Sequence, residues 1–289
     1  MQKILYPFAK RFIAGEDIAT ALLAIRSLQT AGHLTSVDIL GENVRDATQA
    51  QSAKDAYLEL LAQSEDLPSL NDCSVKLTQL GLEIDPELCK KLLREILQAS
   101  GQHSVRLDME GSNRTQATID MCLTHHAEYS NLGLALQAYL FRSQADLETL
   151  MDRGISVRLC KGAYKEPASI AYQTMDKVRK NYLQLAYPLL KNGYQPAIAT
   201  HDEYLLKKIL SFIATEKISA DSFFFEMLYG VGRDMQSYLR DRGYRVRVYV
   251  PFGKAWLPYT LRRLAERKEN IIFVVKHILQ EALGLRKLR

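Results

Sequence analysis

Residues 154–164 read Gly-Ile-Ser-Val-Arg-Leu-Cys-Lys-Gly-Ala-Tyr. A glycine precedes a short apolar run, and cations and small residues follow it. Seven further apolar runs along the chain follow the same plan, at residues 36–42, 73–80, 104–110, 131–139, 195–202, 222–230 and 245–253. Eight strand-like runs that close on polar residues are typical of a (β/α)8 barrel, in which all the carboxyl strand ends face one rim and carry the catalytic groups.

The polar residues that close these runs therefore form a candidate active site. They are Glu42, Lys76, Asp108, Gln137, Arg158, Lys161, Thr200, His201, Glu226 and Tyr249. A barrel of this kind takes about 250 residues, so a single domain accounts for almost all of a 289-residue chain.

Helical signals alternate with the strand-like runs. Residues 85–87, Asp-Pro-Glu, read as an N-cap, a proline in the first turn and an acidic residue, and predict a helix that continues to about Gln98. Glycines stand where such helices end, as C′ residues do. They are Gly101, Gly154, Gly193 and Gly243. The repeated order of helix, glycine and strand predicts parallel strands joined by right-handed crossovers.

The two ends of the chain suggest a division into an N-terminal helical segment, residues 1–35, and a barrel, residues 36–289. Residues 17–31 have the apolar spacing of a helix that precedes the first strand. The terminal segment 271–289 is apolar and then basic, which is typical of a helix packed on the barrel and leaves open a weak contact with a membrane surface.

Composition excludes several classes of protein. Hydrophobic residues make up 47% and charged residues 25% of the chain, as in a globular domain with one large core. No stretch approaches the roughly 20 apolar residues of a membrane helix, and the first residues lack the apolar core of a signal peptide. We therefore expect a cytoplasmic protein, with peripheral contact at the inner face of the membrane left open.

Neither a metal nor nucleic acid is expected as a partner. Cys73, Cys89, Cys122 and Cys160 form no C-x-x-C pair, so zinc and disulfides are not expected and each thiol reads as a small buried side chain. The net charge of +5 comes from interleaved acidic and basic residues rather than from a dense basic stripe.

Individual strand ends allow more than one interpretation. Lys76 within Val75-Lys76-Leu77 needs a partner or a ligand anion if it is buried, and a pair with Asp108 on the neighbouring strand is natural, although a purely structural pair would look the same. Lys161 stands beside Gly162 and Ala163, where small residues let a flat or phosphorylated ligand approach. A histidine after Thr200 at a strand end, His201, is a better site candidate than a lone histidine.

The last strand leads into a helix rich in arginine. Pro258 is expected to open it, and Arg262 and Glu266 then stand four residues apart on one face. Arg262 and Arg263 are suited to bind a carboxylate through paired hydrogen bonds. A solvated helix with an ordinary ion pair remains the alternative.

Together these segments resemble the proline dehydrogenase family, the flavin enzymes of proline catabolism. The resemblance covers most of the chain from Phe12 onward, and its most specific parts are residues 158–164 and 249–253 followed by Arg262-Arg263. Residues 75–77, 107–110, 136–139 and 199–201 fall in the family order. The resemblance is to the monofunctional bacterial type, and it implies a distorted (β/α)8 barrel with a short N-terminal helical segment and the eighth helix over the barrel mouth.

The resemblance also implies a role for each site residue. FAD would lie at the carboxyl rim, in contact with Met109, Gln137, Arg158, Lys161, Gly162, Ala163, Thr200 and His201. Arg158 would lie near flavin N5, where a cation stabilises electron density on the reduced ring. The residues expected to bind the substrate carboxylate are Lys76, Arg262 and Arg263. Tyr164, Leu228 and Tyr249 would enclose the pyrrolidine ring, and Asp108 would stabilise Lys76, which makes Asp108 and Arg158 the catalytic candidates.

The reaction implied is the first step of proline degradation to glutamate. L-proline would lose hydride from C5 to flavin N5, giving Δ1-pyrroline-5-carboxylate, and a quinone would take the electrons. Arg262 would pair with Glu42 at the first strand end and close a gate over the substrate. Tyr249 would crowd the ring and favour proline over hydroxyproline.

Two departures from the family are visible. Related enzymes carry further N-terminal helices, and the chain is too short for the aldehyde dehydrogenase module of the bifunctional relatives. We therefore expect a separate pyrroline-5-carboxylate dehydrogenase to oxidise the product.

Two other functions remain to be tested. A cofactor-free lyase or aldolase would use Lys76 or Lys161 to form a Schiff base. A non-enzymatic barrel would bind a protein partner or nucleic acid, which leaves the ordered polar strand ends unexplained.

Overall fold

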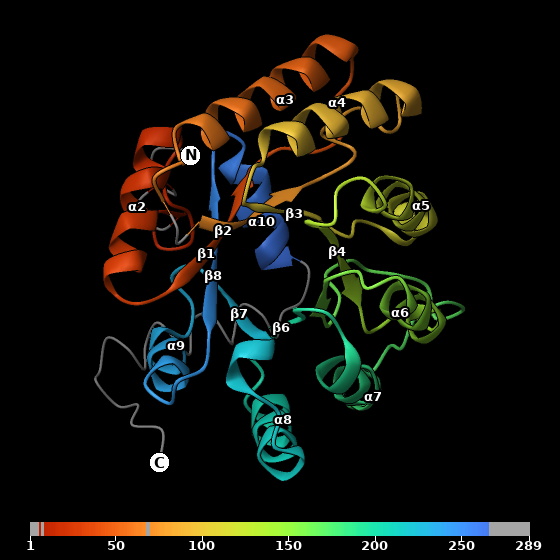
Figure 1. Ribbon diagram of the computed structural model, residues 1–289. Helices are drawn as coiled ribbons and strands as arrows, with labels where there is room; N and C mark the ends of the chain where they lie inside the picture. The colour runs from red at the N-terminus through yellow and green to blue at the C-terminus, as the bar shows by residue number, and fades with distance from the viewer. Residues whose placement is uncertain (1–5, 7–8, 68–69, 266–289) are drawn as a thin grey trace.

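The computed structural model describes Tyr6, residues 9–67 and residues 70–265, with side chains described as far as Thr260 and with that of Asn71 left aside. Eight parallel strands form a closed barrel in chain order (Figure 1). They are β1 (Leu34–Ile39), β2 (Leu70–Val75), β3 (Ser104–Leu107), β4 (Leu132–Gln137), β5 (Val157–Cys160), β6 (Ala197–Ala199), β7 (Phe224–Leu228) and β8 (Val246–Phe252). The predicted (β/α)8 barrel is confirmed.

The helices alternate with the strands around the barrel, except that the first precedes β1 and the last, after β8, lies across the barrel mouth (Figure 1). They are α2 (Ile18–Thr30), α3 (Ala47–Ala62), α4 (Pro86–Ala99), α5 (Thr115–His126), α6 (Ser143–Asp152), α7 (Met175–Asn192), α8 (Glu203–Glu216), α9 (Arg233–Arg240) and α10 (Trp256–Ala265), with the 3-10 turns η1 (Ser112–Arg114) and η2 (Ala220–Ser222). The barrel closes between β1 and β8, where Leu34 pairs with Arg247 and Ile39 with Phe252.

Capping residues fix where several helices begin. Asp85 precedes α4, and its carboxylate accepts the main-chain N–H groups of Glu87 and Leu88, as predicted from the sequence. Asp17 caps α2 in the same way through the N–H of Thr20. The helix expected over residues 17–31 is therefore confirmed to within one residue at each end.

The predicted C′ glycines divide into two groups. Gly101, Gly154 and Gly243 have φ of +55°, +67° and +82°, in the left-handed region that ends helices. Gly193 differs, because its φ is −76° and its backbone is extended. Glycine is needed there for space, since a Cβ would lie 2.5 Å from the carbonyl oxygen of Leu189.

Polar residues do not all lie at the strand ends. Lys76, Asp108 and Thr200 directly follow β2, β3 and β6, as expected of residues that close the apolar runs. Arg158, Glu226 and Tyr249 lie inside β5, β7 and β8. The barrel therefore carries polar groups deep in its interior as well as at its rim.

The main apolar core lies between the strands and the surrounding helices. Val37, Cys73, Val75 and Val105 are outward-facing strand residues that are fully buried in it. Cys89 and Cys122 are also buried, Cys160 is half-buried, and all four cysteines are free thiols. Because alternate strand residues point to opposite faces, the apolar set faces the helices and the polar set fills the barrel.

A second, smaller apolar cluster lies at the carboxyl end of the barrel. Trp256 and Tyr259 of α10 pack with Ala9, Ile13 and Leu40, the last of which directly follows β1. Figure 1 accordingly draws α10 across the centre of the strand ring. The predicted placement of this helix over the barrel mouth is confirmed, although the helix begins at Trp256, two residues before the proline expected to open it.

The first strand begins at Leu34, two residues before the predicted run. The division of the chain into an N-terminal segment, residues 1–35, and a barrel, residues 36–289, stays a prediction. Glu266 and the segment 271–289 lie outside the described residues. Among the described residues, no helix has both the length and the apolar character needed to cross a membrane.

Candidate active site

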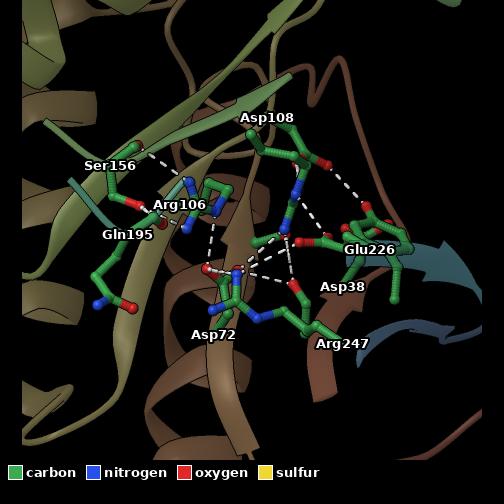
Figure 2. A network of polar contacts seen from close by, with 12 residues as sticks. Asp38, Asp72, Arg106, Asp108, Ser156, Gln195, Glu226 and Arg247 are labelled. Atoms are coloured by element: carbon green, nitrogen blue, oxygen red, sulfur yellow. Dashed lines mark hydrogen bonds and ion pairs between the residues drawn. The ribbon is translucent and has the colours of Figure 1, made fainter. Parts of the chain in front are cut away.

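A cluster of eight charges, seven of them buried and Asp108 partly exposed, fills the barrel interior (Figure 2). Its four cations are Lys76, Arg106, Arg158 and Arg247, and its four carboxylates are Asp38, Asp72, Asp108 and Glu226. The formal charges cancel. This balance matters because an unpaired charge at such a depth would be far more costly than one at the surface.

Arg158 is the centre of the cluster. Its Nη1 donates to Asp108 Oδ1 at 2.7 Å, and its Nη2 lies 3.0 Å from Asp72 Oδ1. Its Nε lies 2.6 Å from Glu226 Oε1 as an ion pair without hydrogen-bond alignment. The Nη2 also donates to the hydroxyls of Ser36 and Ser74, at 2.8 and 2.9 Å. One guanidinium therefore holds three carboxylates from three different strands or strand ends.

Below Arg158, Asp72 joins two further arginines. Its Oδ2 accepts from Arg106 Nε at 2.8 Å and lies 3.4 Å from Arg247 Nη1 (Figure 2). Arg247 also lies 3.4 Å from Glu226, and its guanidinium stacks on the ring of Phe224. Burial and the neighbouring arginines lower the pKa of Arg247 to about 10, so it stays protonated at neutral pH. These residues form the floor of the site.

Above Arg158, Lys76 lies between two carboxylates. Its Nζ donates to Asp38 Oδ1 at 2.6 Å and to Asp108 Oδ2 at 3.2 Å. The predicted pair with Asp108 is confirmed, but Asp38 is the closer partner. Tyr249 donates its hydroxyl to the same Asp108 oxygen at 2.7 Å, and its ring lies under the Arg158 guanidinium, 5.1 Å from it.

The charges fix the protonation of these groups. Burial alone would lower the pKa of Lys76, but Asp38 and Asp108 raise it well above its ordinary value. Burial would raise the pKa of Asp108, but Lys76 and Arg158 lower it below its ordinary value. Burial and the Asp108 carboxylate raise the pKa of Tyr249. At neutral pH the site thus holds an ammonium, a carboxylate and a protonated phenol in contact.

Gln137 ties two parts of the rim together. At the end of β4, its Nε2 donates to the carbonyl of Glu110 at 2.9 Å, and its Oε1 accepts the N–H of Ala163 at 3.2 Å. Met109, next to Glu110, is buried. The amide therefore fixes the segment after β3 against the loop after β5.

Gly162 allows a close approach to an aromatic ring. Its φ is +120°, and a Cβ would lie 1.8 Å from the ring of Tyr139. Only glycine satisfies both conditions. The loop after β5 therefore packs closely against Tyr139 at Gly162.

Lys161 is oriented by a buried carboxylate. Its Nζ lies 3.2 Å from Asp202 Oδ2, which also accepts from Arg179 Nε at 2.9 Å. The other oxygen of Asp202 caps α8. Burial acts to raise the pKa of Asp202, but Arg179 and Lys161 lower it overall. The ammonium is thus held at the rim with part of its surface exposed.

Thr200 and His201 lie at the end of β6. The hydroxyl of Thr200 accepts the N–H of Asp202 at 3.1 Å. His201 Nε2 accepts the N–H of Leu228, the last residue of β7, at 3.0 Å, which assigns the proton of a neutral imidazole to Nδ1. Leu228 is thereby fixed beside the site.

A carboxylate clamps the loop that carries Tyr164. Glu166 accepts the N–H of Ser112 at 2.7 Å and its hydroxyl at 2.5 Å, and so ties the loop after β5 to the loop after β3. Arg114 then contacts Glu83 and Asn43, next to Glu42. Tyr164 is half-buried. The rim loops after four strands are therefore connected.

The side chains of Arg262 and Arg263 lie outside the described residues, although both belong to α10. The gate pair of Arg262 with Glu42 stays a prediction for the same reason. Of the other predicted residues, the structure brings Lys76, Asp108, Arg158 and Tyr249 into direct contact.

Sequence reasoning missed five groups of the site: Asp38, Asp72, Arg247, Arg106 and the Glu166 clamp. A signal for the first three exists in the sequence. In Val246–Phe252 the residues Arg247, Tyr249 and Pro251 alternate with valines and a phenylalanine, and Asp72 and Ser74 alternate in the same way. Period-two polar residues inside an apolar strand predict a polar barrel interior.

Comparison with known proteins identifies the family. The sequence model described as proline dehydrogenase matches residues 21–276 of this chain. The chain belongs to the proline dehydrogenase family. It is accordingly an enzyme of proline oxidation in proline catabolism.

Curated relatives support this membership, because the sequence similarity extends over nearly their whole length. Proline dehydrogenase 2 of Bacillus subtilis (strain 168) is 36% identical over 270 residues, which cover 93% of this chain and 89% of the relative. The proline dehydrogenase of Deinococcus radiodurans is 35% identical over 283 residues, which cover 96% of this chain and 91% of the relative.

Solved structures agree in fold. Proline utilization A of Bdellovibrio bacteriovorus superposes with a TM-score of 0.83 at 26% identity, over 91% of this chain. This chain spans 33% of that longer protein. The corresponding protein of Corynebacterium freiburgense gives a TM-score of 0.79 at 23% identity, over 96% of this chain and 33% of its own, and supports the fold alone.

The rim of this proline dehydrogenase family barrel fits a flavin nucleotide. Hydrogen-bond donors and a cation stand at the ends of β4, β5 and β6, and the Gly162–Ala163 step presents backbone without a large side chain.

Proposed function

We propose that the protein oxidises L-proline to Δ1-pyrroline-5-carboxylate with FAD as its cofactor, as the first step of proline degradation to glutamate. The observation that carries the proposal is Lys76, held at 2.6 and 3.2 Å by Asp38 and Asp108 beside Tyr249 in a chain of this family. A fixed ammonium at the barrel mouth suits a small substrate with one carboxylate.

FAD would be held by residues at the ends of β3 to β6. They are Met109, Gln137, Arg158, Lys161, Gly162, Ala163, Thr200 and His201. When bound, FAD would supply at N5 the acceptor for the hydride from proline C5, and a quinone would then take the electrons. Lys161, fixed by Asp202, supplies a positive charge that suits the diphosphate.

The protein's own residues would orient the substrate. Lys76, Arg262 and Arg263 would bind the carboxylate, while Tyr164, Leu228 and Tyr249 would enclose the ring. The ring nitrogen must be unprotonated for its lone pair to form the C=N bond. Asp108 stays ionised and holds Lys76 and Tyr249 in place, so the carboxylate anchor is rigid and places C5 for reaction.

Two finer proposals concern access and specificity. Glu42 and Arg262 would form a gate over the bound substrate, and Glu42→Gln should then weaken proline binding and turnover. Tyr249 leaves little room for a 4-hydroxyl group, so Tyr249→Ser should gain activity on hydroxyproline. Unchanged kinetics of the first variant, or no gain in the second, would remove the respective proposal.

The reaction implies partners outside this chain. A quinone would accept the electrons, which requires at least transient contact with the inner face of a membrane by a protein working in the cytoplasm. A separate pyrroline-5-carboxylate dehydrogenase would oxidise the product. Rates of proline oxidation with a water-soluble quinone and with a vesicle-embedded quinone would measure how strongly the membrane affects electron transfer to the acceptor.

The visible spectrum of the pure protein tests the proposal. A flavin spectrum that bleaches when L-proline is added without oxygen supports it. A colourless protein that borohydride traps as a covalent adduct with substrate would support the aldolase alternative instead. The structure argues against that alternative at Lys76, because a raised pKa keeps the amine protonated whereas a Schiff-base lysine needs a lowered one.

A further inference from the structure

Residues 9–16, here called the N-terminal arm, lie along the carboxyl ends of two barrel strands. The N–H of Ala14 donates to the carbonyl of Pro251 in β8 at 2.8 Å, and the N–H of Gly253 donates to the carbonyl of Gly15 at 3.0 Å. These two main-chain bonds join the arm to the end of β8. The arm is therefore part of the rim in the folded protein.

A close approach at Gly230 fixes the arm on its other side. Gly230 follows β7 and has φ of +72°, and a Cβ there would lie 1.6 Å from the carbonyl oxygen of Arg11. Any other residue would push the arm away from the barrel. The arm consequently lies across the ends of β7 and β8, which carry Leu228 and Tyr249.

The arm also holds the beginning of α10. Trp256 is the first residue of that helix and is the one tryptophan of the chain. Its indole Nε1 donates to Glu16 Oε1 at 2.6 Å, and its ring is buried against Ala9 and Ile13. The orientation of α10 at its first turn is therefore set by a hydrogen bond from outside the barrel.

We propose that Glu16 is a positioning residue for the substrate carboxylate site. It acts through Trp256 on α10, the helix that carries Arg262 and Arg263, and the inference rests on the function proposed for those arginines. Arg262 follows Trp256 by six positions, about 9 Å along the helix. A small tilt at Trp256 would therefore displace the part of α10 that carries both arginines, and binding of a small substrate is sensitive to such displacements.

The test compares Glu16→Ala and Glu16→Gln with a matched control, Asp17→Ala. Asp17 is the neighbouring residue and caps α2, so its loss destabilises the same region, but among the described residues its side-chain hydrogen bonds stay within that cap. The readouts are the KM and kcat for L-proline in the flavin-loaded enzyme, the tryptophan emission maximum and the melting temperature.

For Glu16→Ala we expect the KM for L-proline to rise about fivefold, while kcat stays within about twofold of the wild-type value. A factor of this size corresponds to the loss of one partly exposed hydrogen bond. The emission of Trp256 should shift to longer wavelength as water reaches the indole. Glu16→Gln keeps an acceptor oxygen and should restore most of both values. Asp17→Ala should lower the melting temperature and leave KM and emission unchanged.

Two results would overturn the proposal: wild-type KM and emission in Glu16→Ala, or an equal rise of KM in Asp17→Ala, which would make the effect one of general stability. The proposed function fails separately, if the wild-type protein binds no flavin or does not oxidise proline. In that case the emission shift still decides whether Glu16 orients α10.

Discussion

The barrel interior and the rim after β5 both hold cations against carboxylates, yet in different ways. In the interior, Arg158 is 3% exposed and contacts three carboxylates. At the rim, the side chain of Lys161 is 28% exposed and shares one carboxylate with Arg179. The interior cation is almost wholly enclosed by its partners, whereas the rim cation keeps part of its surface exposed.

The difference separates two uses of charge in one site. Interior charges fix geometry, because removal of one leaves its partners buried and unpaired, at about 3–5 kcal/mol. Rim charges contribute little to stability, about 0–1 kcal/mol, but remain available for binding. The following predictions test this division, from the largest expected effect to the smallest.

Arg158→Met should break the interior cluster. Asp72, Asp108 and Glu226 lose their common partner, so the free energy of unfolding should fall by about 3–5 kcal/mol and proline turnover should be lost. Urea denaturation measures the first effect. Arg245→Met is the control, because Arg245 stacks on Phe224 and bonds neutral oxygens without a carboxylate partner at bonding distance. Equal losses in the two variants would contradict the special role of the cluster.

Lys76→Met should lower both stability and turnover, because this interior charge is also proposed to bind the substrate carboxylate. The substrate carboxylate loses its fixed ammonium and two carboxylates face each other, so kcat/KM for L-proline should fall at least about a hundredfold. Lys54 provides a match, because it also lies between two carboxylates, Asp55 and Glu95, but far from the site on α3. If Lys54→Met lowered kcat/KM as much, the loss could not be assigned to substrate binding.

Glu166→Ala should loosen the loop that carries Tyr164. The bonds to the N–H and hydroxyl of Ser112 disappear, so we expect kcat/KM to fall about threefold to tenfold with a small loss of stability. Glu166→Gln keeps one acceptor and should lie between the wild type and the alanine variant. Steady-state kinetics and thermal melting measure the two effects, and an unchanged kcat/KM in both variants would show that the clamp does not position Tyr164.

Glu110→Gln should slightly stabilise the protein at neutral pH. Burial raises the pKa of Glu110 above its ordinary value of 4.5, although Thr78 hydrogen bonds oppose the shift. The folded state then binds the proton more tightly than the unfolded state, so this group's contribution to stability falls as pH rises through that range.

The glutamine variant removes that loss while keeping partners for Thr78. We expect a gain of about 0.5–1 kcal/mol in the free energy of unfolding at pH 7 that disappears below about pH 4. Urea denaturation at both values measures it. A gain that stays constant with pH would show that Glu110 is not the titrating group.

The interior and the rim also differ in how well the sequence predicted them. The strand ends at Lys76, Asp108 and Gln137 were predicted because each closes an apolar run, and the Lys76–Asp108 pair follows from their adjacent strands. Asp72 and Arg247 were not, since a polar residue in the middle of a strand gives no sign of its partner. Arg247 lies 175 residues after Asp72 in the sequence. The two residues pair only because β8 closes the barrel beside β1.

The sequence by itself determined the order of strands and helices, the caps and most residues of the rim. These depend on periodicity and on contacts within a few residues, which are local properties of the chain. Tertiary structure alone decided which carboxylate holds Lys76, how three acids share Arg158, and that the arm at Glu16 reaches Trp256. Those contacts join residues that only the closure of the barrel brings within bonding distance, where burial makes the pairing of charges obligatory.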